Sequence, residues 1–167
     1  MIRYPVIALL AAFAAPASAA VVGQSPHGFE VKHDVVVPLD AAGTWKRLLA
    51  IGTWWSDDHT FSGKAANLAI DPKAGGCFCE TWAKGSVQHM RVSYIADSQR
   101  LVLNGPLGPL MFEGVAGMMD LRLSPAGPHT RVTMVYRAGG FARANGTDMA
   151  PLVDRVLGEQ MERLAKP

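Results

Sequence analysis

The chain has 167 residues and a formal net charge of +2, with 49% hydrophobic and 18% charged residues. Because the basic residues are scattered and nearly balanced by acidic ones, this composition argues against nucleic acid or an anionic membrane as a partner. The length is typical of one domain with a substantial core, and we expect a single domain over residues 21–167.

The first 20 residues have the pattern of a secretory signal peptide. Arg3 precedes an apolar run over residues 6–15, and small residues follow as far as Ala20. The run is too short for a bilayer core, which needs about 20 apolar residues. We therefore expect a Sec-type signal peptide of bacterial style over residues 1–20. Cleavage would leave a periplasmic or secreted protein without stable membrane insertion; an uncleaved anchor is the alternative.

The remaining chain predicts mostly strands. Residues 29–37 alternate between apolar and polar side chains, which predicts a strand that Pro38 ends. Asp40 is a suitable N-cap for a helix up to residue 52, and residues 53–63 predict a turn or broken helix that completes a short helical pair. Six further strands are predicted over residues 67–71, 76–83, 87–96, 100–105, 117–124 and 130–138.

The last segment, residues 147–166, predicts a long amphipathic helix with apolar residues at three- and four-residue steps. Short turns make the six-strand run antiparallel, and an antiparallel sheet needs cover on one face. The terminal helix is the only large cover that the sequence offers. We therefore predict an α+β fold with an antiparallel sheet curved around this helix and an apolar space between them.

The order of these elements resembles that of the SRPBCC superfamily, which includes START-like lipid-transfer domains, polyketide cyclases/dehydrases and pollen-allergen-like proteins. The resemblance covers residues 28–165. It rests on the strand closed by Pro38, the helix of Trp45, and the stretches "TWWSDDHT", "DPKAGGCFCE", "SQRLVL" and "TRVTMVYRAGGF". It implies a helix-grip fold, a seven-stranded antiparallel sheet around a long C-terminal helix, with a deep cavity for hydrophobic molecules.

We expect aromatic and apolar side chains to bind the ligand. Trp54 and Trp55 predict either a hydrophobic plug at one end of the sheet or a cavity rim whose indole N–H groups bind a ligand oxygen. The segment 104–114, rich in glycine, proline and apolar residues, predicts either a lid or a partner surface. The expected ligand-binding residues are Trp54, Trp55, Phe61, Trp82, Met90, Phe112, Met119, Leu157 and Met161.

Cys77 and Cys79 are the only cysteines of the chain. On a regular strand their Cα atoms would lie about 6.6 Å apart with parallel Cβ vectors, which is poor geometry for a disulfide. An oxidising compartment favours a disulfide. We give the geometry more weight and expect buried free thiols; a disulfide and a metal-binding or reactive pair are the alternatives.

Glu80 and His89 are the candidate catalytic residues. A two-residue hairpin turn at Lys84 and Gly85 would place them directly opposite each other. If that face lines the cavity, His89 could act as a general base oriented by the carboxylate. If the face is solvent-exposed, the two residues form a surface salt bridge, and a one-residue slip of register would separate them.

The favoured hypothesis is therefore an exported carrier or sensor that encloses a hydrophobic small molecule or lipid. The alternative is a polyketide cyclase- or dehydratase-like enzyme, a lyase or isomerase, that uses Glu80 and His89. A weaker third hypothesis is a partner-protein-binding module. The sequence contains no phosphate-binding glycine loop, nucleophile elbow or zinc-protease motif, so we expect neither a cofactor nor a metal. Ligand identity and oligomeric state are left open.

Overall fold

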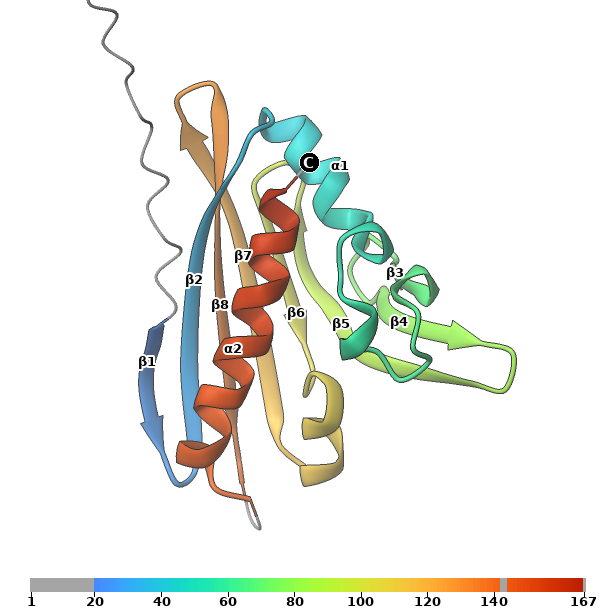
Figure 1. Ribbon diagram of the computed structural model, residues 1–167, viewed down its shortest axis with the longest axis vertical. Helices are drawn as coiled ribbons and strands as arrows, with labels where there is room; N and C mark the ends of the chain where they lie inside the picture. Colours follow the sequence, from blue (N-terminus) through green and yellow to red (C-terminus); the bar gives the residue numbers. More distant parts are fainter. Residues whose placement is uncertain (1–19, 142–143, 167) are drawn as a thin grey trace, which may run out of the picture.

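The computed structural model describes residues 20–141 and 144–166, so the expected signal peptide lies outside the described residues except for Ala20. The elements follow one another in the order β1 (Ala20–Ser25), β2 (Gly28–Val37), α1 (Ala41–Leu49), η1 (Ile51–Thr53), η2 (Asp57–His59), η3 (Ala65–Asn67), β3 (Leu68–Ile70), β4 (Cys77–Trp82), β5 (Gly85–Ala96), β6 (Arg100–Asn104), η4 (Gly108–Glu113), β7 (Ala116–Ala126), β8 (His129–Gly139) and α2 (Gly146–Ala165), where η marks a 3₁₀ helix (Figure 1).

The strands form one antiparallel sheet in the order β1-β2-β8-β7-β6-β5-β4-β3. The predicted α+β class and the antiparallel sheet are confirmed. The predicted number of strands was one too low, because β1 extends the sheet beyond β2 with pairs from Ala20 opposite Lys32 to Ser25 opposite Gly28. The sequence of β1, AVVGQS, has no alternating pattern. Its extended conformation is stabilised by backbone pairing with β2, which periodicity does not detect.

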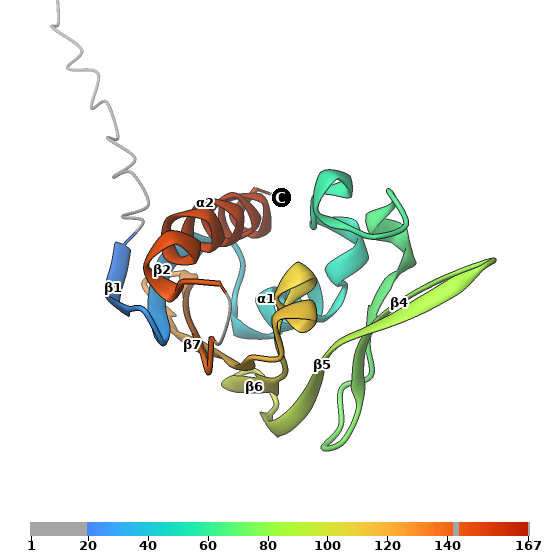
Figure 2. The same ribbon diagram turned by 90° about the horizontal axis from the view of Figure 1, so that it is seen from below.

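Helix α2 lies on the concave side of the sheet, together with η4 (Figure 2). Its Leu157, Met161 and Leu164 side chains are buried in the core. The helix begins at the N-cap Asn145, whose side chain accepts a hydrogen bond from the Thr147 N–H at 2.9 Å. At its other end Arg47 of α1 donates to the Leu164 carbonyl at 2.7 Å, so α1 and the end of α2 are held together.

His33 of β2 is fully buried beneath α2, as expected of a core histidine. Its Nε2 lies 3.0 Å from Oδ1 of Asp154 on α2, although the angles are not those of a hydrogen bond. The Asp154 side chain therefore faces β2. Gly158 stands beside this pair, where an added Cβ would lie only 2.9 Å from Cε1 of His33. This glycine allows α2 to approach β2 closely.

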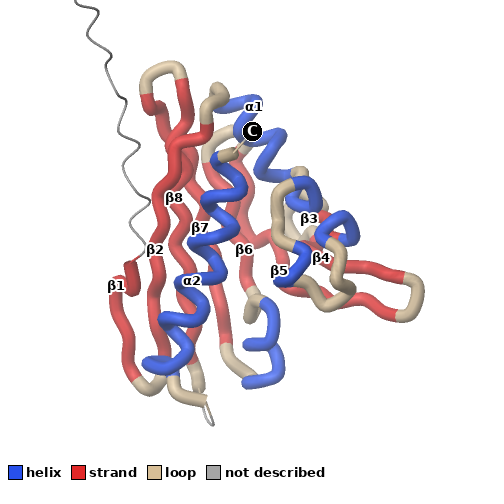
Figure 3. The backbone as a smooth tube through the Cα atoms, viewed as in Figure 1, coloured by secondary structure: helices blue, strands red, loops and turns tan. Residues whose placement is uncertain are grey.

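The segment between β2 and β3 covers the other end of the sheet (Figure 3). Asp40 caps α1 as predicted, because its carboxylate accepts a hydrogen bond from the Gly43 N–H at 2.7 Å. Trp45 and Leu48 of α1 are buried, and the predicted turn or broken helix over residues 53–63 contains the short 3₁₀ helix η2 between η1 and η3. None of the described helices is both long and apolar enough to cross a membrane.

Candidate ligand-binding cavity

A cavity of about 300 Å³ lies between α2 and the inner face of β4 and β5. One wall is the apolar stripe of α2, formed by Met149, Leu152, Val153, Val156 and Leu157. The facing wall consists mainly of aromatic residues from the η2 segment and from β4 and β5. This volume is at the lower end of the range for small-molecule sites, and a largely apolar lining is typical of them.

The segment Leu107–Leu110, which was predicted to be either a lid or a partner surface and is called the lid below, lines the cavity. Tyr136 of β8 holds this segment, because its hydroxyl accepts a hydrogen bond from the Leu107 N–H at 3.0 Å. Burial raises the pKa of Tyr136 to about 12, which keeps the phenol protonated. Phe112, a predicted ligand-binding residue, is 65% exposed instead, with its ring against the edge of Phe61.

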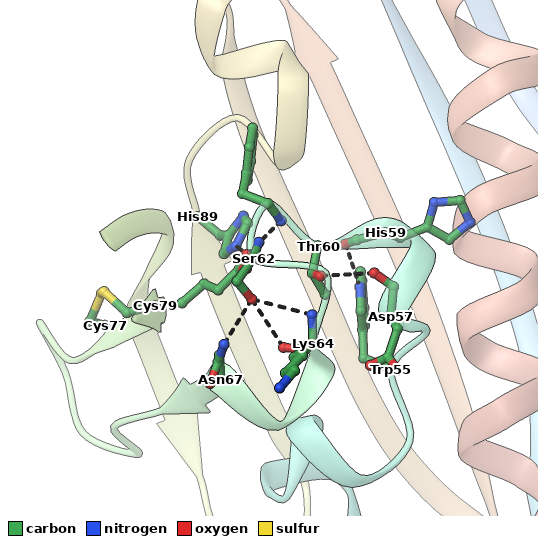
Figure 4. Close-up of polar contacts among 12 residues, drawn as sticks. Trp55, Asp57, His59, Thr60, Ser62, Lys64, Asn67, Cys77, Cys79 and His89 are labelled. Carbon is green, nitrogen blue, oxygen red and sulfur yellow. Dashed lines mark hydrogen bonds and ion pairs between the residues drawn. A yellow bond between two sulfur atoms is a disulfide. The ribbon is translucent and has the colours of Figure 1, made fainter. Parts of the chain in front are cut away.

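Trp54 and Trp55 are both buried at one end of the sheet. The Trp54 indole N–H donates to the Arg47 carbonyl at 2.9 Å. The indole N–H of Trp55 donates to the His59 carbonyl at 3.0 Å (Figure 4). The proposed role of these N–H groups as ligand donors is therefore not supported, because backbone carbonyls already occupy them. The ring of Trp55 still lines the cavity.

The other predicted ligand-binding residues are divided between four places. Phe61 and Leu157 line the cavity. Trp54, Met119 and Met161 border a smaller space of about 20 Å³ deeper in the core. Met90 is fully buried and borders neither space, and Trp82 lies at the tip of the β4–β5 hairpin.

The β4–β5 hairpin closes one residue earlier than predicted. Trp82 pairs with Gly85, so the turn residues are Ala83 and Lys84, and Glu80 faces Val87 instead of His89. The predicted direct pairing was therefore wrong. Gly85, predicted to be a turn residue, is the first residue of β5, and its role is steric, because an added Cβ would lie 2.7 Å from the Trp82 ring.

A β-bulge brings His89 to Glu80 nevertheless. Phe78 pairs with Met90 and Cys79 with Gln88, which leaves His89 as an extra residue without a partner on β4. His89 and the following Met90 are both buried. From this position Nε2 of His89 lies 3.1 Å from Oε2 of Glu80, and the two side chains are 4% and 0% exposed.

Glu80 is ionised in this environment. Burial alone would raise the pKa of its carboxyl, but hydrogen bonds from Ser62, from the backbone N–H groups of Phe61 and Ser62, and from His89 outweigh burial and lower it. The Phe61 N–H donates at 3.0 Å, and the Ser62 N–H donates to the other carboxylate oxygen. Neither amide could have been identified from the sequence, because backbone donors leave no residue signature.

His89 is neutral, because burial lowers its pKa despite the opposing effect of Glu80. A carboxylate can only accept hydrogen bonds, so Nε2 of His89 must carry the ring proton and Nδ1 presents a lone pair. Nδ1 is buried and has no hydrogen-bond partner within the described part of the chain. The ring lies between Phe61 and Phe78, at centroid distances of 5.8 and 5.1 Å, and His89 lines the cavity. His89 is therefore a cavity-lining residue with an unused acceptor or base at Nδ1.

Cys77 and Cys79 form a disulfide, so the expectation of buried free thiols was wrong. The two residues are half-buried on the face of β4 opposite Phe78 and Glu80. Their Cα atoms are 5.3 Å apart, less than in a regular strand and within the range that disulfides span. The disulfide lies well away from His59 (Figure 4). Residues 20–141 and 144–166 contain no cluster of three or more His, Cys, Asp or Glu that could hold a metal.

At the cavity mouth, the ring of His59 reaches toward α2 (Figure 4). Its Nε2 lies 3.2 Å from Oε2 of Glu159, and Arg163 donates to the other oxygen of the same carboxylate at 3.0 Å. Burial would raise the pKa of Glu159, but hydrogen bonds from Arg163 and His59 lower it. Asp58 also lines the mouth and is exposed. The His59–Glu159 contact joins residues 100 positions apart, so no local pattern predicts it.

No protein-family model and no curated protein matches the chain. Solved structures do match its fold. Mll3558 from Rhizobium loti is 17% identical with a TM-score of 0.58, over 83% of this chain and 95% of that one. CalU16 from Micromonospora echinospora is 14% identical with a TM-score of 0.54, over 83% and 73%. DynU16, from the dynemicin biosynthetic locus, is 13% identical with a TM-score of 0.56, over 82% and 46%. At these identities the likeness shows a shared helix-grip-like fold.

Proposed function

We propose that this protein is an exported carrier or sensor of the SRPBCC type that encloses a hydrophobic small molecule between α2 and the sheet. The observation behind this proposal is the 300 Å³ cavity with its apolar helix wall and aromatic facing wall. Export is consistent with the Cys77–Cys79 disulfide, because disulfides persist in oxidising compartments. The shared fold agrees with the superfamily resemblance of the sequence.

The test is to isolate the protein from its own host and analyse it by native mass spectrometry. We expect a bound small molecule that is released when the protein is denatured, and recovery of the protein in the periplasmic or secreted fraction. Extraction with organic solvent would then identify the molecule. A protein that is ligand-free and remains ligand-free after exposure to a host lipid extract would refute the carrier hypothesis.

A second candidate function is an enzyme that removes a proton next to a ligand carbonyl, as an aldol-type cyclisation or dehydration requires. Nδ1 of His89 is the base, and the ionised Glu80 fixes the required tautomer. The buried, unpartnered lone pair is the specific observation that favours this candidate. The occurrence of a protein of this fold in a biosynthetic locus is consistent with it.

This candidate predicts that the protein accelerates deuterium exchange at the methyl group of an apolar aryl methyl ketone such as acetylnaphthalene. Proton NMR in heavy water measures the rate. His89→Ala should abolish the acceleration, and Glu80→Gln should reduce it. If the ketone is bound by the wild-type protein but its deuterium exchange proceeds at the uncatalysed rate, the enzyme candidate is refuted and the carrier function remains.

A further inference from the structure

Some polar groups of the cavity wall have partners within the protein, whereas one buried acceptor has none. The Thr60 hydroxyl donates to the Asp57 carbonyl at 2.8 Å, the Trp55 indole to the His59 carbonyl, and Nε2 of His59 contacts Glu159. Nδ1 of His89 is the buried side-chain atom of this wall that has no partner among the described residues. A residue of the cavity wall therefore carries an acceptor that no described residue uses.

We propose that the ligand is an uncharged, ring-containing molecule whose inner end is a hydroxyl group, above all a phenol, that donates a hydrogen bond to Nδ1 of His89. This inference rests on the proposed binding function and specifies the ligand class. It also predicts that ionised carboxylates, the head groups of fatty acids, are rejected.

The hydroxyl follows from the tautomer. Because Glu80 holds the proton on Nε2, Nδ1 can accept but cannot donate. A buried acceptor left unsatisfied is destabilising, and a ligand O–H that donates to it removes that cost. An ether or ketone oxygen at the same place cannot donate a hydrogen bond, so its lone pair would face the lone pair of Nδ1 and the two would repel each other. The ring of His89 between Phe61 and Phe78 extends an aromatic wall, against which a flat ring packs well.

The rejection of anions follows from the charges. Among the described residues that line the cavity there is no Lys or Arg, whereas Asp58 lies at the mouth. Glu80 is ionised directly behind His89, and Arg163 is already paired with Glu159. A carboxylate at the inner end would lose its hydration without gaining a cationic partner, and it would lie near the Glu80 charge. Such a burial is strongly unfavourable.

Three probes with one skeleton test the inference: a naphthol, the corresponding methoxynaphthalene and the corresponding naphthoate. Isothermal titration calorimetry at neutral pH gives their dissociation constants for the purified wild-type protein. We expect the naphthol to bind about 3- to 10-fold tighter than the ether, the value of one net hydrogen bond. The naphthoate should bind most weakly.

A pair of variants tests whether His89 causes the preference for the naphthol over the ether. His89→Leu should bind the naphthol and the ether equally, because the acceptor is gone. His129→Leu, the same change at an exposed site on β8, should keep the wild-type preference. Should His89→Leu fail to fold, nitrogen-15 NMR of the wild-type protein replaces it: the Nδ1 resonance should be that of an unprotonated nitrogen and should move when the naphthol binds.

The outcomes separate the two proposals. If the ether binds as tightly as the naphthol, or if the naphthoate binds most tightly, the hydroxyl inference is overturned while the binding function stands. If none of the three probes binds and the protein also yields no native ligand, the binding function fails and the inference fails with it.

Discussion

Glu80 and His89 are not opposite each other in the β4–β5 hairpin, yet Nε2 of His89 lies 3.1 Å from Oε2 of Glu80 inside the protein. The contact exists because His89 is the extra residue of a bulge. The bulge directs the imidazole to the concave face, where Glu80 already accepts two backbone hydrogen bonds. The chemistry of the cavity therefore depends on one irregularity in an otherwise regular strand pair.

The buried pair predicts that the protein loses stability in acid. His89 has a pKa below its ordinary value of 6.5 when folded, so below pH 6.5 the unfolded chain binds a proton that the folded protein does not. Glu80 has a pKa below 4.5 when folded, and its contribution is lost as the pH falls through that lowered value. Urea unfolding from pH 8 to pH 4 should therefore show a decreasing free energy of unfolding that starts near pH 6.5.

The control for this pH dependence is His89→Leu, which should flatten the decrease between pH 6.5 and 5. The decrease at lower pH should remain, because Asp34 and Asp120 also have lowered pKa values, despite burial, through their hydrogen bonds and ion pairs. An identical slope in the variant and the wild type above pH 5 would show that His89 is not the group responsible.

The disulfide predicts that the denatured, unreduced protein has no titratable thiol. Replacing both Cys77 and Cys79 with Ser should lower the free energy of unfolding by about 1–2 kcal/mol, because the closed loop is very short. Under reducing conditions the variant and the wild type should become nearly equal in stability. Two titratable thiols per chain in oxidised protein would contradict the assignment.

Because the Tyr136 hydroxyl holds the lid, we expect its removal to loosen the lid and no other part of the sheet. Tyr136→Phe removes the acceptor of the Leu107 N–H and should reduce stability by about 0.5–1.5 kcal/mol. Hydrogen exchange should show that the Leu107 amide loses protection while the amides of β8 keep theirs. The matched change Tyr94→Phe, at a side chain 51% exposed on β5, should leave the Leu107 amide unaffected. Unchanged protection in Tyr136→Phe would mean that the lid is held otherwise.

At Gly158 we expect an exception to the rule that alanine is more favourable than glycine inside a helix. Glycine to alanine inside a helix normally stabilises by about 0.5–1 kcal/mol. Here the new Cβ would lie 2.9 Å from Cε1 of the buried His33, so we expect Gly158→Ala to destabilise the protein by about 1–3 kcal/mol. Thermal unfolding measures the change. A raised melting temperature would show that β2 and α2 can separate here at little cost.

The sequence predicted the elements whose residues repeat with a regular period. The alternation in β2 and the three- and four-residue steps of α2 are direct consequences of burying one face, so both were identifiable. β1, the bulge at His89 and the close approach of Trp82 to Gly85 depend on contacts with other parts of the chain. The disulfide was missed because the Cα spacing of an ideal strand was assumed for Cys77 and Cys79, whose Cα atoms are only 5.3 Å apart.

The most direct measurement of the central claim is a titration with an environment-sensitive hydrophobic dye, compared between two tryptophan variants of α2. Val153 is half-buried in the cavity wall, whereas Arg155 is exposed on the same helix. If the cavity beneath α2 binds ligands, we expect saturable uptake of one dye per chain by the wild type, loss of uptake in Val153→Trp, and wild-type uptake in Arg155→Trp. Equal uptake by both folded variants, or no uptake by the wild type, would contradict a ligand-binding cavity beneath α2.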